Sequence, residues 1–116
     1  NAILQVPDTV GSDNIPLFAG AALRLKIPLG VSLENYTNIK GVLFSYSLDL
    51  KEHGKEVAGL VNRVLKGAPP SRIPIDSPRK YYLTINLQTA REIGLEVPRD
   101  MLSLADRLIT SSSDGR

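Results

Sequence analysis

The second half of the chain alternates helix and strand signals, and this order limits the fold more than any other feature. One helical pattern ends at Gly67-Ala68-Pro69-Pro70, and another begins at Asn86-Leu87-Gln88-Thr89-Ala90. Between them, Ile73-Pro74-Ile75 and residues 81–85 have the composition of strands. The alternation predicts an α/β fold, a three-layer sandwich around a mainly parallel sheet, in which binding sites lie on the loops at strand ends.

The length of 116 residues fits one domain, which we assign to residues 1–110, with residues 111–116 as a disordered tail. A content of 42% hydrophobic and 22% charged residues is that of a globular protein. The net charge of +2 is spread without a basic stripe, which argues against nucleic-acid binding. The sequence has no cysteine, which excludes disulfides and thiolate catalysis. Residues 3–6 look like a buried strand reached without a lead-in, so we expect a fragment of a longer protein.

The first half of the sequence predicts a strand–helix–strand unit of the parallel type. A strand at residues 3–6 is followed by a polar turn and by a helix with Pro16 in its first turn. A second strand follows at residues 29–33, and a third at residues 42–47. The face of the helix that we expect to be buried consists of Ile15, Phe18, Ala22 and Leu25.

Three further helices are predicted. The first, at residues 50–66, stops at Gly67 and has a repeating apolar face that we expect to be buried, made of Val57, Leu60, Val61, Val64 and Leu65. Asn86 is the predicted N-cap of the second, which ends at Gly94. The third begins at Pro98, and its expected buried residues are Met101, Leu102, Ala105, Leu108 and Ile109.

The usual signatures of catalysis are missing from the sequence. His53, the sole histidine, lies among charged residues of the predicted helix at 50–66, which is typical of a solvated surface side chain. The sequence has no ligand spacing typical of a metal site, no dinucleotide or P-loop glycine motif, and no nucleophile elbow. We therefore predict a protein that is not an enzyme and that needs no metal or cofactor. The alternative from another class is a flavodoxin-like enzyme or phospho-receiver, which would require further carboxylates beside Asp8.

The loop after the first strand is the best candidate for a binding site. Asp8, Thr9 and Ser12 place a carboxylate and two hydroxyls where α/β folds bind ligands. Capping of the following helix by Asp8, Ser12 or Asp13 is an equally good interpretation of the same residues. Tyr46 belongs to a second polar set, where its ring either lines a cleft or packs at a strand end.

Several motifs in order give the chain a resemblance to a known family. They include Val6-Pro7-Asp8-Thr9-Val10, Val64-Leu65-Lys66-Gly67 and Ile93-Gly94-Leu95-Glu96-Val97-Pro98. From Ile3 to Ile109 the sequence resembles the carboxy-terminal part of ABC transporter substrate-binding proteins, the periplasmic proteins of the aromatic amino-acid or tryptophan type. It departs from that pattern at Ser47, where members of the family carry glycine or another small residue.

The resemblance implies a two-lobed protein of the type I periplasmic-binding (Venus flytrap) kind, located outside the cytoplasmic membrane. Such a protein binds a small solute, often an amino acid, between its lobes. By resemblance, Asp8 and Thr9 would contact the amino group and polar edge of the ligand, followed by Ser32, Glu34 and Tyr46.

The partners implied are the small solute, the amino-terminal lobe that this sequence lacks, and a membrane permease. A ligand-sensing domain of a receptor such as a histidine kinase is the alternative, with a receptor module in place of the permease. Because the missing lobe would leave apolar surface exposed, we also expect the fragment to form a homodimer.

Overall fold

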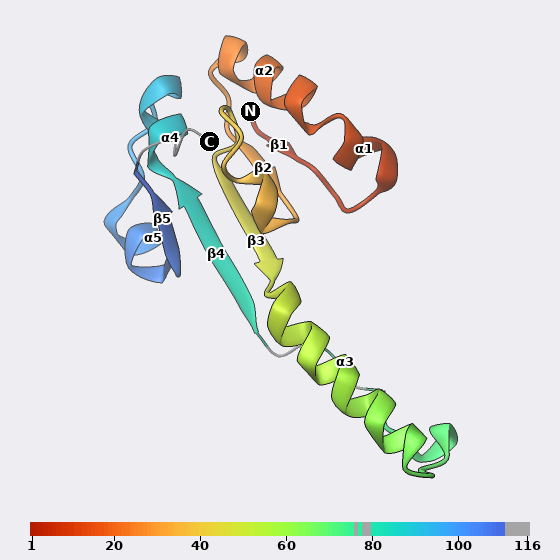
Figure 1. Ribbon diagram of the computed structural model, residues 1–116. Helices are drawn as coiled ribbons and strands as arrows, with labels where there is room; N and C mark the ends of the chain where they lie inside the picture. The colour runs from red at the N-terminus through yellow and green to blue at the C-terminus, as the bar shows by residue number, and fades with distance from the viewer. Residues whose placement is uncertain (76, 78–79, 111–116) are drawn as a thin grey trace, which may run out of the picture. The chain divides into compact units, whose positions relative to one another are not determined.

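The computed structural model describes residues 1–75, 77 and 80–110 and divides the chain into two compact units. The first unit contains residues 1–47 and the chain from residue 82 onward, and the second contains residues 48–81. The predicted disordered tail, residues 111–116, lies outside the described residues. Figure 1 labels the helices and strands along the chain.

The first unit is built on a five-stranded sheet whose spatial order follows the sequence. The pairs β1–β2, β2–β3 and β4–β5 are parallel, whereas the arrows of β3 and β4 run in opposite directions in Figure 1. The predicted α/β class with a mainly parallel sheet is confirmed. The strands are β1 (Ile3–Leu4), β2 (Leu29–Val31), β3 (Phe44–Leu48), β4 (Tyr81–Asn86) and β5 (Arg107–Ile109).

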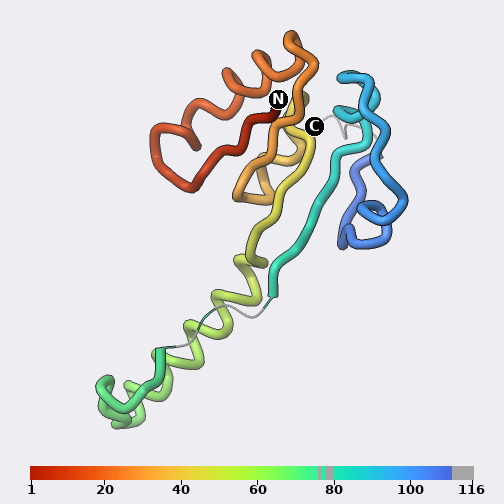
Figure 2. The backbone as a smooth tube through the Cα atoms, turned by 180° about the vertical axis from the view of Figure 1, so that it is seen from behind, coloured from red at the N-terminus to blue at the C-terminus, as the bar shows by residue number. Residues whose placement is uncertain are grey.

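The crossover from β1 to β2 contains α1 (Thr9–Asp13) and α2 (Ile15–Leu25), and Figure 2 shows its path from behind. The predicted turn before α2 is in fact the short helix α1. The buried residues of α2 are Ile15, Ala19 and Ala22. They pack against Leu29 and Val31 of β2 and against Val42, which precedes β3. The prediction that Leu25 is buried was wrong: it is 67% exposed, because it lies roughly a quarter turn away from that stripe.

The crossover from β2 to β3 contains the short 3-10 helix η1 (Glu34–Tyr36) and returns to the same core. Tyr36 and Ile39 pack against the cluster around α2. Gly41 then brings the chain close to α2 with φ of 102°, and a Cβ there would lie 2.4 Å from the carbonyl oxygen of Ala19. Only glycine fits this position without strain.

Strand β4 leads directly into α4 (Leu87–Ile93), as the sequence predicts. The side chain of Asn86 accepts hydrogen bonds from the amides of Gln88 and Thr89, and Gly94 ends the helix in a left-handed conformation. Ala90 and Ile93 of α4 form a second core cluster with Leu43.

The C-terminal part of the described chain corrects one prediction. The helix α5 (Arg99–Leu104) is short, and the expected helical residues Leu108 and Ile109 belong instead to strand β5. Of the five residues expected to be buried, only Ile109 is buried. Reciprocal hydrogen bonds, from the Leu83 amide to the Asp106 carboxylate and from the Asp106 amide to the Leu83 carbonyl, draw this segment into the sheet.

The second unit contains α3 (Leu50–Leu65) and the 3-10 helix η2 (Pro70–Arg72). The predicted bounds of α3 are confirmed, but the prediction of a buried face was wrong, because no residue of α3 is buried. Large apolar residues exposed along α3 are Leu50, Val57, Val61, Val64 and Leu65. The predicted strand at Ile73-Pro74-Ile75 was also wrong, since these residues have no strand partner in the described chain and Ile75 is fully exposed.

Charged groups at the start of α3 stabilise one another. The carboxylate of Asp49 accepts hydrogen bonds from the amides of Lys51 and Glu52. These bonds, above all the one from Glu52, lower the pKa of Asp49. The neighbouring Glu52 carboxylate accepts a hydrogen bond from Lys55 and thereby raises the pKa of that ammonium group. His53 lies 3.5 Å from the Glu56 carboxylate on the same helix.

Candidate ligand-binding site

The carboxyl ends of the three parallel strands β1, β2 and β3 lie at one edge of the sheet. Residues 7–9 follow β1, residues 32–34 follow β2, and Tyr46 is the middle residue of β3, two residues before its end. Pairing of β1 with β2 continues past the strand, since the Gln5 amide donates to the Gly30 carbonyl at 2.9 Å. In α/β folds this edge is where ligands bind, and all five predicted site residues lie on or next to it.

Asp8 and Thr9 lie at the start of α1. Asp8 is the N-cap, and its Oδ1 accepts a hydrogen bond from the Gly11 amide at 2.6 Å. The capping interpretation of Asp8 is therefore confirmed for one carboxylate oxygen, while the side chains of Asp8 and Thr9 remain exposed. Gly11 permits this arrangement, because a Cβ at that position would lie 2.6 Å from Asp8 Oδ2.

Ser32 is joined to β1 through Gln5. The hydroxyl of Ser32 donates to Gln5 Oε1 at 3.1 Å, and the side-chain Nε2 of Gln5 donates to the Val6 carbonyl. Gln5 is 7% exposed. Sequence reasoning missed Gln5, although a polar residue within the apolar run at residues 3–6 was a usable signal.

The Glu34 carboxylate bonds to side chains of β4 and β5. Its Oε1 accepts from Arg107 Nη1 at 2.9 Å and from the buried Thr84 hydroxyl at 3.4 Å. The carboxylate thus links the loop after β2 to β4 and β5. Arg107 was missed because its segment was expected to be helical. With the Arg107 and Glu34 side chains 57% and 37% exposed, the pair contributes about 0 to 1 kcal/mol to stability.

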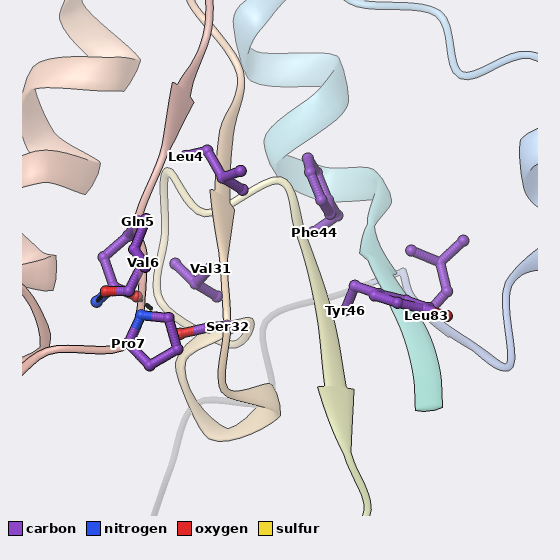
Figure 3. Close-up of a pocket in the computed structure, with 9 residues that line it drawn as sticks. All are labelled: Leu4, Gln5, Val6, Pro7, Val31, Ser32, Phe44, Tyr46 and Leu83. Atoms are coloured by element: carbon purple, nitrogen blue, oxygen red, sulfur yellow. Dashed lines mark hydrogen bonds between the residues drawn. The ribbon is translucent and has the colours of Figure 1, made fainter. Parts of the chain in front are cut away.

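Tyr46 and Ser32 line one hollow on the sheet, drawn in Figure 3. Its volume is about 510 Å³, and most of its lining is apolar. Asp8 lies in a neighbouring hollow of about 290 Å³, and Gln5 lines both. The structure therefore brings Ser32 and Tyr46 together and places Asp8 beside them, whereas Thr9 and Glu34 line neither hollow. The larger hollow is lined by Leu4, Gln5, Val6, Pro7, Val31, Ser32, Phe44, Tyr46 and Leu83.

Three hydroxyl groups of the first unit are buried. The side-chain oxygens of Thr37, Ser45 and Ser47 are buried, and within the part of the chain that the structure describes they have no hydrogen-bond partner. Ser47, where the sequence departs from the family pattern, lies inside β3 and is not among the residues with positive φ. A serine is therefore compatible with the backbone at this position.

The chemistry available at the edge is that of hydrogen bonding and charge. Among residues 1–75, 77 and 80–110, no group of three or more histidine, cysteine and acidic side chains is placed to hold a metal ion. The carboxylates that a phospho-receiver needs beside Asp8 are thus not found within these ranges. Nor does any described helix have the length and apolar character needed to cross a membrane.

Comparison with known proteins identifies the family. A model of the family described as ABC transporter substrate binding protein matches residues 1–109. The chain belongs to this family. Membership supports a solute-binding role, and the family is not a class of enzymes. No curated protein sequence matches the chain significantly.

Solved structures share the fold. A conserved domain protein from Vibrio cholerae has a TM-score of 0.83 at 23% identity, with 92% of this chain and 36% of that chain covered. An ABC domain in complex with L-Trp from Streptococcus pneumonia has a TM-score of 0.80 at 27% identity, with 93% and 37% covered. A ligand-free, open substrate-binding protein with adhesive properties from Clostridium difficile has a TM-score of 0.64 at 18% identity, with 90% and 34% covered. The chain thus spans little more than a third of these proteins.

Proposed function

We propose that this chain is part of the solute receptor of an ABC importer, located outside the cytoplasmic membrane, and that its solute is an amino acid. The observation that carries the proposal is the family match over residues 1–109. The polar side chains at the carboxyl ends of β1, β2 and β3 supply the groups that such a solute requires. The bound L-Trp in the protein from Streptococcus pneumonia supports an amino acid as the solute class.

Asp8 is the proposed partner of the ammonium group of the solute. One carboxylate oxygen caps α1, and the exposed side chain leaves the other available for a charge-assisted hydrogen bond. Such a bond contributes about 1.5 to 3 kcal/mol when it is well formed, or roughly 10- to 150-fold in affinity. The adjacent Thr9 hydroxyl is the proposed second polar contact.

Ser32, Tyr46 and Glu34 have supporting roles in the proposed site. Ser32 is held by the buried Gln5, so its hydroxyl is oriented before the solute arrives. The ring of Tyr46, 59% exposed, offers an apolar surface with a polar tip. Glu34 is engaged by Arg107 and acts on the solute through its charge and through the position of its loop.

A second lobe completes the site in this proposal. The larger hollow lies on the sheet, and the smaller one lies beside β1, α1 and α2. The opposite wall of the cleft comes from the remaining part of the longer protein. Solute binding then favours a closed state, which the permease recognises. The 116-residue chain by itself is expected to bind solute weakly or not at all.

A thermal-shift experiment on the longer natural protein tests this function. Asp8→Asn removes the charge and keeps a good N-cap, so the melting temperature without solute should stay unchanged. The rise in melting temperature caused by a bound amino acid should shrink in Asp8→Asn and persist in the matched control Asp13→Asn. Equal rises in both variants would contradict the role of Asp8, and no rise with any amino acid would contradict the function.

A further inference from the structure

One face of β4 is polar where it carries Thr84 and Asn86. Side chains alternate along a strand, so these two residues lie on the face opposite Leu83, which lines the larger hollow in Figure 3. Both are buried, with 1% and 4% of their surface exposed. Buried polar side chains are nearly always hydrogen-bonded, so the partners of these two residues show what this face of the strand holds.

Both side chains bond to the segment that follows β2. The hydroxyl of Thr84 donates to Glu34 Oε1 at 3.4 Å, and Asn86 Nδ2 donates to the carbonyl of Thr37 at 2.9 Å. Glu34 is the first residue of η1, and Thr37 is its C-cap. Strand β4 therefore holds η1 at both of its ends through polar bonds.

Strand register brings Arg107 of β5 to the same carboxylate. Thr84 and Arg107 are Cα partners across β4 and β5, so their side chains lie next to each other on one face of the sheet. Arg107 Nη1 donates to Glu34 Oε1 at 2.9 Å. A single carboxylate oxygen thus accepts from two neighbouring side chains, one buried and neutral and the other charged. We call Thr84 and Arg107 the Glu34 seat.

The seat lies close to the proposed solute site along the chain. Ser32, two residues before Glu34, lines the larger hollow together with Tyr46, and its hydroxyl is bonded to Gln5. Residues 32–34 are therefore tied to Gln5 by a neutral hydrogen bond and to β4 and β5 by a charge-assisted one. With one residue between the two ties, a shift of Glu34 also moves Ser32.

We propose that Thr84 and Arg107 are positioning residues of the solute site, which hold the Glu34 carboxylate and thereby fix the loop that carries Ser32. The inference rests on the proposed function, and neither residue of the seat contacts the solute. Because the Arg107 and Glu34 side chains are partly exposed, losing this ion pair should weaken the hold on the loop by about 2- to 5-fold.

Hydrogen exchange of the 116-residue chain without solute tests the seat. The Thr37 amide donates to the Glu34 carbonyl at 2.9 Å, so its exchange reports opening of this loop. The Leu43 amide, which donates to the Leu29 carbonyl at 2.8 Å, is the reference for opening of the sheet. Arg107→Gln should speed the exchange of Thr37 relative to Leu43 by about 2- to 5-fold.

Three further variants separate charge, hydroxyl and general effects. Arg107→Lys keeps the charge, so it should speed the exchange of Thr37 less than Arg107→Gln does. Thr84→Val keeps the shape of the side chain and removes the hydroxyl, so it should also speed this exchange. Arg24→Gln is the matched control, because it removes an equal charge from an exposed position on α2 and should leave the exchange of Thr37 unchanged.

Calorimetry with L-tryptophan tests the link to the solute site in the longer protein that we propose contains this chain. Arg107→Gln should raise the Kd of L-tryptophan by a factor similar to its effect on exchange. In a Glu34→Gln background the same substitution should have no further effect, because Arg107 acts through Glu34. A residue that only stabilised the fold would change the Kd equally in both backgrounds.

Each measurement has a result that overturns the proposal. Equal acceleration of Thr37 and Leu43 exchange, or no acceleration of either, would overturn the seat. A Kd that Arg107→Gln leaves unchanged, or changes equally with and without Glu34, would overturn the positioning role. Absence of L-tryptophan binding by the unsubstituted protein would overturn the link to this solute, and the solute-free exchange of Thr37 then decides separately whether the seat holds the loop.

Discussion

Asn86 connects three parts of the first unit, and its substitution has a calculable cost. The side-chain oxygen caps α4 by accepting from the amides of Gln88 and Thr89, both at 3.1 Å. The side-chain NH₂ donates to the carbonyl of Thr37 at 2.9 Å. Asn86 is 4% exposed, so water cannot readily replace these bonds.

Asn86→Ala removes both functions. Loss of an N-cap costs about 0.5 to 2 kcal/mol, and a buried carbonyl left without its donor costs about 1 to 3 kcal/mol. The expected loss in the free energy of unfolding is therefore about 1.5 to 5 kcal/mol, a large part of the stability of a small domain. Asn86→Asp keeps the oxygen that caps α4 but loses the NH₂ donor to the Thr37 carbonyl. The expected loss in the free energy of unfolding is then the cost of the unpaired carbonyl, together with any repulsion between it and the new carboxylate.

Urea unfolding at pH 7, followed by circular dichroism, measures these differences. Asn62→Ala on the exposed α3 is the matched control and should not lower the stability, because alanine favours a helix. A loss below about 0.5 kcal/mol for Asn86→Ala, within the usual range of surface substitutions, would refute the reasoning.

Three further predictions concern backbone, pH and association. Gly41→Ala should lower the free energy of unfolding by about 2 to 5 kcal/mol, because of the positive φ and the contact with the Ala19 carbonyl. In Gly20→Ala on α2 the added Cβ meets no atom within 4 Å, so this variant should be more stable by about 0.5 to 1 kcal/mol. Equal urea midpoints for the two variants would contradict this. The carboxylate of Asp49 should titrate by NMR below its ordinary pKa of 3.8, so that its cap contributes fully above that pH and is lost as the pH falls through the lowered value; titration at or above 3.8 would count against the cap. Light scattering should show the 116-residue chain as a homodimer held by the apolar stripe of α3, and Val61→Lys should give a monomer. A monomeric unsubstituted 116-residue chain at high concentration would disprove this association.

Features set by local chemistry were predictable from the sequence. Asn86 and Gly94 bound α4 because a capping side chain and a left-handed glycine act within one turn of the helix. The same chemistry bounds α3, through the Asp49 cap and through Gly67 with its positive φ of 95°. The α/β class followed from the order of these signals.

Features set by distant contacts were not predictable. The apolar stripe of α3 shows which face would be buried but not whether anything in the chain covers it. Residues 107–109 form β5 because Asp106 bonds to Leu83, which is distant in sequence. Arg107 reaches Glu34 because residues 107–109 form β5. The predicted ligand residue Glu34 therefore accepts a hydrogen bond from an arginine that no local sequence pattern indicates.

Calorimetry of the longer protein that we propose contains this chain, titrated with aromatic and branched amino acids, tests the central claim most directly. Saturable binding of at least one of them at one site per chain, with no chemical conversion of the solute, is the predicted result. The absence of binding heat across the whole panel, with a protein shown to be folded, would contradict the account.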